Sequence, residues 1–256
     1  IIHRDTEIEL AAEVNFMIPP ITSASHPHLK SLSFPVEEYQ ERVRKVQRAM
    51  ASLDLDALLC HTASNICYLT GFEAVLWFKY TLAVVPREGD PILLAEDFEM
   101  PNACATVWLK DLVSYPCGGD PIPATQALLR KHGLAKKRLG IEINRWSFSV
   151  PTYQRLQDAL STATLVDATH ILESIKAIKS PAEIDVMRRS AQLTSDGMKA
   201  ALACVKKGTT DNHVVAAAYK ALLEGGSEYM SLDPIVTVGA RSSIPHSTHR
   251  RVPICA

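Results

Sequence analysis

The sequence has almost no excess charge of either sign and no long apolar run. Lys and Arg total 27 and Asp and Glu total 28, which gives a formal net charge of -1. Proteins that bind nucleic acid or anionic membranes carry a clear basic surplus, so we expect neither as a partner. No apolar stretch reaches the roughly 18 residues that span a bilayer, and the first twenty residues lack the basic-then-apolar order of a signal peptide. We therefore expect a soluble, cytoplasmic protein.

Cysteine is sparse, and several common motifs are missing. The six cysteines contain no C-x-x-C pair, which argues against a disulfide scaffold and against structural zinc. There is no G-x-G-x-x-G after a strand and no Walker loop, so nucleotide binding is poorly supported. H-E-x-x-H and G-x-S-x-G are also missing, which excludes the usual signatures of zinc proteases and α/β-hydrolases.

Apolar residues make up 47% of the 256 residues, enough for a packed core, and the length favours two domains. Residues 1–33 have no sustained periodicity and contain Pro19-Pro20, so we expect a tail, with a short helix possible over residues 6–14. The chain begins at Ile1 and stops at Ala256 just after a cluster of His and Arg. On this basis we expect a fragment of a longer protein.

Strands and helices alternate from residue 36 onward. Apolar residues spaced by three and four from Val36 predict a helix. We expect strands at residues 55–60, 80–86, 91–95, 138–142 and 164–166, and helices at residues 125–132 and 151–160. Arg87-Glu88-Gly89-Asp90 has the composition of a hairpin turn. The alternation predicts an α/β domain with the sheet covered on both faces.

A second region begins near His170. Ser180-Pro181-Ala182-Glu183 is a strong helix start, because Ser180 and Glu183 can cap each other's backbone N–H groups. The apolar spacing extends this helix to Gly208. A second helix is expected over residues 214–223 and a strand over residues 235–238.

Six short strings occur together in one order along the chain: Phe34-Pro35-x-x-Glu38-Tyr39 with Arg42; Asp56-Ala57-Leu58-Leu59; Asn65-x-x-Tyr68-Leu69-Thr70-Gly71-Phe72; Arg138-Leu139-Gly140-Ile141-Glu142; Ile178-Lys179-Ser180-Pro181-x-Glu183-Ile184; and Ile235-Val236-x-x-Gly239 before Pro245-His246. This set resembles the creatinase and Xaa-Pro aminopeptidase superfamily, the prolidase-like pita-bread metallohydrolases. The resemblance implies a creatinase-type N-terminal α/β domain over residues 34–168. It also implies an incomplete α+β pita-bread catalytic domain over residues 170–256, truncated partway through.

Members of this superfamily usually hydrolyse amide-type C–N bonds at a site with two divalent metal ions (Mn, Co or Zn), although creatinase works without metal. Their metal ligands, two Asp, one His and two Glu, lie C-terminal to the histidine that matches His246. The sequence ends ten residues after His246, so no metal ligand can be assigned. The resemblance therefore predicts metal ions and a peptide or small amide substrate for a full-length parent, with this chain as its inactive front half. It also implies a homodimer.

Four residues are candidates for contact with substrate. The resemblance makes His246 the residue that hydrogen-bonds the substrate carbonyl or the tetrahedral intermediate, and the alternative is a loop histidine without a role. His249 is either part of a binding site or a solvated loop residue, since a lone His-x-x-His pair leaves a metal site short of ligands. Arg241 can hold an anionic group or belong to a surface cluster with Arg250 and Arg251. Trp77 can form a pocket wall or pack in the core.

Two classes of function remain open. The first is a metal-dependent hydrolase, most simply an Xaa-Pro aminopeptidase or dipeptidase, with ectoine or creatine as alternative substrates. The second is a non-catalytic α/β module that associates with itself or with a partner.

Overall fold

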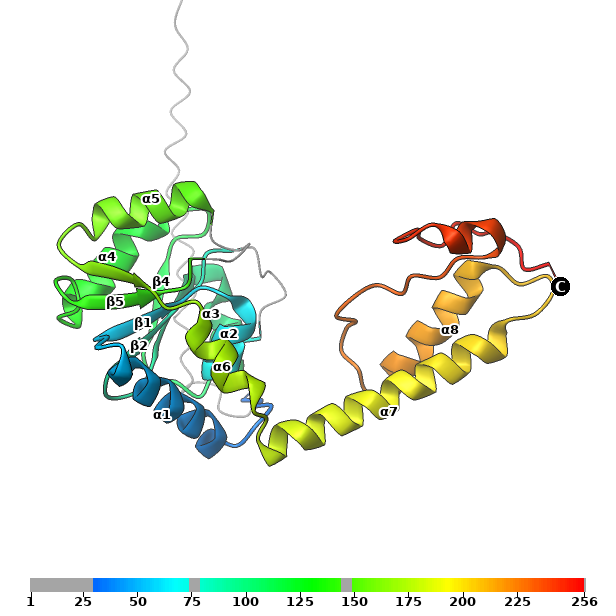
Figure 1. The fold of residues 1–256 in the computed structure, drawn as a ribbon, viewed down its shortest axis with the longest axis horizontal. Coiled ribbons are helices and arrows are strands. Elements are labelled where there is room, and N and C mark those ends of the chain that lie inside the picture. The colour runs from blue at the N-terminus through cyan, green and yellow to red at the C-terminus, as the bar shows by residue number, and fades with distance from the viewer. Residues whose placement is uncertain (1–29, 74–78, 144–148, 256) are drawn as a thin grey trace, which may run out of the picture. The chain divides into compact units, whose positions relative to one another are not determined.

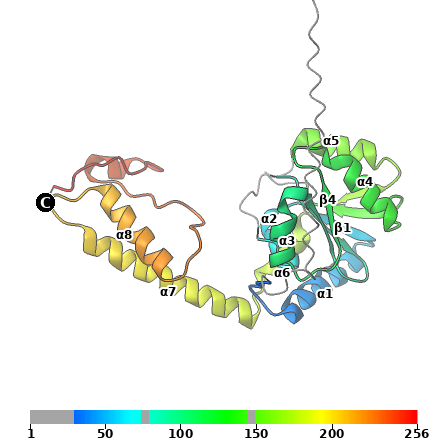
Figure 2. The ribbon, with the colours of Figure 1, turned by 180° about the vertical axis from the view of Figure 1, so that it is seen from behind.

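The computed structural model describes residues 30–73, 79–143 and 149–255. The chain divides into two compact units, Ile1–Ala177 and Ile178–Ala256, which are described separately below (Figures 1 and 2). The helix expected within residues 6–14 lies outside the described residues. None of the helices in the described ranges is long and apolar enough to cross a membrane.

The first unit is built on a six-stranded sheet in the order β4-β3-β2-β1-β5-β6. Its strands are β1 (Ala57–Cys60), β2 (Leu82–Pro86), β3 (Ile92–Glu96), β4 (Leu112–Tyr115), β5 (Arg138–Ile141) and β6 (Thr164–Asp167). The pairs β1–β2 and β2–β3 are antiparallel, whereas β3–β4, β1–β5 and β5–β6 are parallel. The expected hairpin is therefore confirmed as β2 and β3, joined by the turn that contains Gly89 at φ 89°.

Helices cover both faces of this sheet (Figure 1). They are α1 (Val36–Ser52), α2 (Ala63–Thr70), α3 (Met100–Thr106), α4 (Pro121–Lys131), α5 (Val150–Ala159) and α6 (His170–Ala177), with a short 3-10 turn η2 (Asp97–Glu99) before α3. Alternate residues of β1 point to opposite faces. Leu58 and Cys60 pack with α1, α2, α3 and α6, whereas Ala57 and Leu59 pack with α4 and α5. Because both faces of β1 are buried, this strand is apolar throughout, and the expected α/β domain is confirmed.

Four elements of this unit escaped the sequence analysis: α2, α3, α6 and β4. The three helices are only seven or eight residues long, too short to show a helical period. The strand β4 lies at the sheet edge and buries Tyr115 alone, so it lacks a continuous apolar run. Helix α4 also begins earlier than expected, at Pro121, because the Asp120 side chain accepts a hydrogen bond from Ile122 N.

The second unit contains a helical hairpin and an irregular segment. The helices are α7 (Pro181–Cys204) and α8 (Asp211–Glu224), followed by the 3-10 turn η3 (Gly239–Ser243). The expected capping box is confirmed: Glu183 N donates to Ser180 Oγ at 3.2 Å, and Ser180 N donates to Glu183 Oε2 at 2.9 Å. Close packing occurs at Gly197, where an added Cβ would lie 2.9 Å from Leu222 Cγ.

The strand expected over residues 235–238 is wrong. That segment is irregular, and the isolated bridge between Thr210 and Pro253 is the one β-type pairing within residues 178–255. A strand forms only when a neighbouring strand supplies its hydrogen-bond partners. The apolar pattern of residues 235–238 has no such neighbour in the part of the second unit that the structure describes.

Candidate functional site

The candidate histidine lies in an irregular loop after η3. We call residues 244–249 the His246 loop. Its backbone turns sharply: His246 has φ 57°, and Ser247 N donates to Ile244 O at 3.3 Å. A non-glycine residue in this left-handed region is uncommon and costs about 1 kcal/mol or more. The His246 side chain is exposed, so it is available to a ligand.

Arg241 braces this loop from η3. Its Nη2 donates to Ser247 Oγ at 2.6 Å and to Thr248 O at 2.8 Å. Its Nε is buried and has no hydrogen-bond partner among the described residues. The Arg241 guanidinium therefore stabilises the loop through Nη2, while its buried Nε has no hydrogen-bond acceptor among the described residues.

His249 is half-buried at the end of the loop, and its Nδ1 is buried without a hydrogen-bond partner among the described residues. The segment is not helical, so His246 and His249 do not share a helix face as a chelating pair requires. Nowhere in the described ranges do three or more His, Cys, Asp or Glu side chains come together as a possible metal site. The residues present thus do not fit the two-metal centre that the resemblance implies. Trp77 lies outside the described residues.

Asp211, the first residue of α8, is not among the site residues predicted from the sequence. Its side chain is fully buried, and its carboxylate accepts hydrogen bonds from Arg250 N at 3.0 Å, Val252 N at 2.9 Å and Asn212 N at 2.9 Å. Burial by itself raises a carboxyl pKa, but these backbone donors outweigh it and hold the pKa of Asp211 below its usual value. The one sequence signal was the helix-start pattern at residues 209–212, which does not reveal contacts about 40 residues away.

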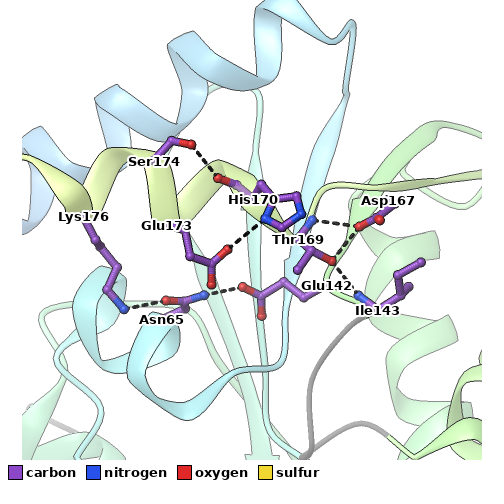
Figure 3. Close-up of polar contacts among 9 residues, drawn as sticks. All are labelled: Asn65, Glu142, Ile143, Asp167, Thr169, His170, Glu173, Ser174 and Lys176. Carbon is purple, nitrogen blue, oxygen red and sulfur yellow. Dashed lines mark hydrogen bonds and ion pairs between the residues drawn. The ribbon is translucent and has the colours of Figure 1, made fainter.

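A second polar cluster lies where the parallel strands β1, β5 and β6 end (Figure 3). Glu142, directly after β5, is buried and accepts hydrogen bonds from His61 N at 2.9 Å, Thr62 N at 2.8 Å and the Asn65 side chain. Asn65 in turn accepts from Lys176 Nζ at 2.8 Å. Ligands of α/β sheets often bind at such carboxyl ends. Here, however, the carboxylate binds the β1–α2 turn itself, so the cluster acts as an internal joint between strands and helices.

Beside this cluster, hydrogen bonds of Thr169 connect the end of β6 with the segment after β5. Thr169 Oγ1 and N donate to Asp167 Oδ1 at 2.5 and 2.9 Å, and Ile143 N donates to Thr169 Oγ1 at 3.2 Å. The Thr169 hydroxyl and then its backbone N–H lower the pKa of Asp167. Figure 3 also shows the start of α6 at His170, whose Nδ1 lies 3.8 Å from Glu173 Oε2.

Arg42 links two of the short sequence strings, the one that begins at Phe34 and the one that begins at Asn65. Its guanidinium carbon lies 4.3 Å from the ring centroid of Phe34 and 4.4 Å from that of Tyr68. Arg42 Nη1 donates to Tyr68 O at 3.1 Å, and Nε lies 3.4 Å from Glu38 Oε1. The planar cation thus packs between aromatic faces and fastens α1 to α2.

Two family descriptions match the chain and together cover most of both units. Residues 42–178 match the Creatinase/Prolidase N-terminal domain. The chain belongs to this creatinase/prolidase family. Residues 185–254 match Metallopeptidase family M24, a stretch that contains η3 and the His246 loop. The expected family and its fold class are both confirmed.

Relatives of this creatinase/prolidase chain include hydrolases and peptidases. It is 28% identical over 236 residues to the ectoine hydrolase of Halomonas elongata, covering 85% of this chain and 59% of that protein. It is 24% identical over 205 residues to a putative dipeptidase of Bacillus subtilis, covering 80% of this chain and 56% of that protein. The chain therefore spans about three fifths of the length of the curated relatives it matches.

Solved structures share the fold. A prolidase from Thermococcus sibiricus matches with a TM-score of 0.72 at 17% identity, over 85% of this chain and 58% of that one. A Xaa-Pro dipeptidase from Bacillus anthracis matches with a TM-score of 0.69 at 18% identity, over 84% and 57% of the two chains. At these identities the match concerns the fold.

Contacts in the first unit explain why several of the short sequence strings contain the residues they do. Arg42 contacts Tyr68, and Glu142 contacts Asn65, so each pair links two strings that lie far apart in the sequence. Gly140 lies where an added Cβ would be 2.7 Å from Leu55 Cδ1 and 2.8 Å from Ala168 Cβ. In this creatinase/prolidase domain, these residues build the fold.

Proposed function

We propose that this chain supplies the N-terminal domain and the His246 loop of a metal-dependent hydrolase that cleaves C–N bonds. The observation that carries the proposal is the match of residues 185–254 to Metallopeptidase family M24. The match of the first unit to the Creatinase/Prolidase N-terminal domain supports the same assignment.

In this proposal His246 is the residue that meets the substrate. Its side chain is exposed on a loop whose backbone Arg241 holds. A neutral or charged imidazole N–H can donate to a substrate carbonyl oxygen as negative charge develops there. We assign His249 and Arg241 to substrate binding beside this loop, because the His249 Nδ1 and Arg241 Nε atoms have no hydrogen-bond partner among the described residues. Trp77 remains our candidate for an aromatic wall.

The described residues do not assemble a metal-ligand set, so we derive no catalytic step through metal from this chain. Two-metal hydrolysis requires several carboxylate ligands. We therefore propose that the chain by itself does not hydrolyse substrate, and that the ligands come from sequence that the curated relatives have beyond the matched portion.

Peptides with proline at the second position are the proposed substrates, because solved structures of the same fold include prolidases and Xaa-Pro dipeptidases. Ectoine is the second candidate, because a relative that matches 85% of this chain is an ectoine hydrolase. Creatine completes the set to be assayed. We further propose that the chain associates with a second copy of itself.

Complementation tests this function. The chain would be assayed against Xaa-Pro dipeptides, ectoine and creatine with Mn²⁺, Co²⁺ or Zn²⁺. It would be tested alone and co-expressed with the portion of the Halomonas elongata ectoine hydrolase that it does not match. We expect turnover in the complemented sample and none in the chain alone. Turnover by the chain alone would contradict the proposed need for outside ligands, and a complex that forms and binds metal without turnover would favour the non-catalytic module.

In the complemented enzyme, His246→Ala is expected to lower kcat more than tenfold, which is about 1.4 kcal/mol of transition-state stabilisation. Metal content should stay the same, because His246 is assigned to substrate. The matched control is His132→Ala, which removes an exposed histidine of the first unit. Loss of metal with unchanged turnover per loaded enzyme would show that His246 has a different role.

A further inference from the structure

The buried carboxylate of Asp211 makes long-range hydrogen bonds in the second unit. Burying a charged carboxylate is costly unless hydrogen bonds satisfy it. Asp211 meets this requirement with backbone N–H donors from Asn212, Arg250 and Val252, all within 3.0 Å. Its position at the start of α8 adds the favourable field of the helix N-terminus.

Two of these donors come from the segment that follows the His246 loop. Arg250 and Val252 flank Arg251, which has φ 62°, and Arg251 N donates to Asn212 Oδ1 at 2.5 Å. Asp211 N donates to Val252 O at 3.2 Å, and Ile254 N donates to Thr209 O at 2.8 Å. The segment is thus held on both sides of a residue in an unfavourable backbone conformation.

Two side chains consequently hold the second half of the His246 loop and the residue that follows it. Arg241 contacts Ser247 and Thr248 inside the loop, and Asp211 contacts Arg250 directly after it. His246, at φ 57°, depends on this restraint because free chains rarely adopt that conformation.

We propose that Asp211 is a positioning residue, whose carboxylate fixes the segment after the His246 loop and thereby orients His246. This inference rests on the proposed function in that His246 is the group to be oriented. A hydrogen-bond acceptor that is buried and charged suits this task, because its bonds to backbone N–H groups are stronger than those of a neutral acceptor.

The test compares Asp211→Asn with the matched control Asp185→Asn, which changes an exposed aspartate on α7. Amide hydrogen exchange would be followed by NMR in the whole chain. We expect the amides of Arg250, Val252 and the His246 loop to exchange at least tenfold faster in Asp211→Asn, with α7 amides unchanged. We also expect the ring resonances of His246 and His249 to move while those of His132 do not. The control should match the wild type.

Unchanged exchange over residues 246–252 would overturn the anchor. Faster exchange with unmoved His246 ring resonances would overturn the positioning role, since Asp211 would then serve stability alone. If Asp211→Asn fails to fold, the second variant is Asn212→Ala, which removes the neighbouring hydrogen bond from Arg251 N. The inference fails unless this variant shows the same changes in amide exchange and in the histidine ring resonances, with smaller amplitude. Neither measurement uses substrate, so inactivity of the complemented enzyme would count against the proposed function and leave this result standing.

Discussion

The two units of the chain bury their apolar side chains to very different degrees. In the first unit the 17-residue helix α1 buries Tyr39, Val43, Val46 and Met50. In the second unit the 24-residue helix α7 buries Gly197 and Ala201 alone. Met198 and Leu202, on the same helix, are 59% and 64% exposed. The first unit therefore has its own hydrophobic core, whereas α7 leaves apolar side chains exposed, and exposed apolar surface favours association.

The largest expected effect concerns the stability that the Glu142 hydrogen bonds give to the first unit. Glu142→Ala should lower its free energy of unfolding by about 3 kcal/mol, because the N–H groups of His61 and Thr62 lose their acceptor and each such loss costs about 1–3 kcal/mol. Urea unfolding followed by tryptophan fluorescence measures this unit specifically, since all three tryptophans precede residue 178. Glu88→Ala, at the exposed hairpin turn, is the control and should change stability by less than ~0.5 kcal/mol. Equal effects of the two variants would show that the joint around Glu142 is dispensable.

The pH dependence of the first unit between pH 6.5 and 4.5 should be the next largest effect. Burial lowers the pKa of His61 from 6.5 to about 3. Below pH 6.5 His61 therefore binds a proton in the unfolded chain but stays neutral in the folded chain. The free energy of unfolding consequently falls as the pH drops from 6.5 toward 3. One proton corresponds to roughly 1.4 kcal/mol per pH unit at most. His61→Gln should flatten the stability curve between pH 6.5 and 4.5, and identical slopes in the two proteins would contradict the burial of a neutral His61.

The smallest expected effect concerns the exposed face of α7. We expect the chain to self-associate, and Leu202→Lys should weaken that association about tenfold, near 1.4 kcal/mol, by placing a charge in the apolar patch. Sedimentation over a concentration series measures the association constant. Leu53→Lys, at an exposed leucine of the first unit, is the matched control. A wild-type chain that stays monomeric at every concentration would show that α7 tolerates its exposure.

Much of the fold was predictable in both units because the signals are local. The stripe from Val36, the Ser180–Glu183 capping pattern and the hairpin turn at Gly89 each depend on a few neighbouring residues, and the structure has all three. The segment 235–238 shows the opposite case. Its apolar pattern was sufficient for a strand, but pairing depends on a neighbour that the local sequence does not specify.

The candidate site was predictable only in part. Resemblance singled out His246, and the spacing of basic residues drew attention to Arg241 and His249. The residue that restrains their loop, Asp211, lies 39 and 41 residues before the backbone N–H groups that it binds. Its burial is a tertiary property, so in the sequence Asp211 looks like an ordinary first-turn acid.

The hydrogen bonds of Asp211 can form only in a certain order during synthesis of the chain. The sheet of the first unit is complete once β6 has been made, at Asp167, and N-terminal domains generally fold first as the chain emerges. When α8 forms, Asp211 has Asn212 N as its near donor, and the other two arrive only when Arg250 and Val252 have been added. A nascent chain that pauses before residue 250 therefore carries a finished first unit beside a second unit whose key carboxylate still faces water.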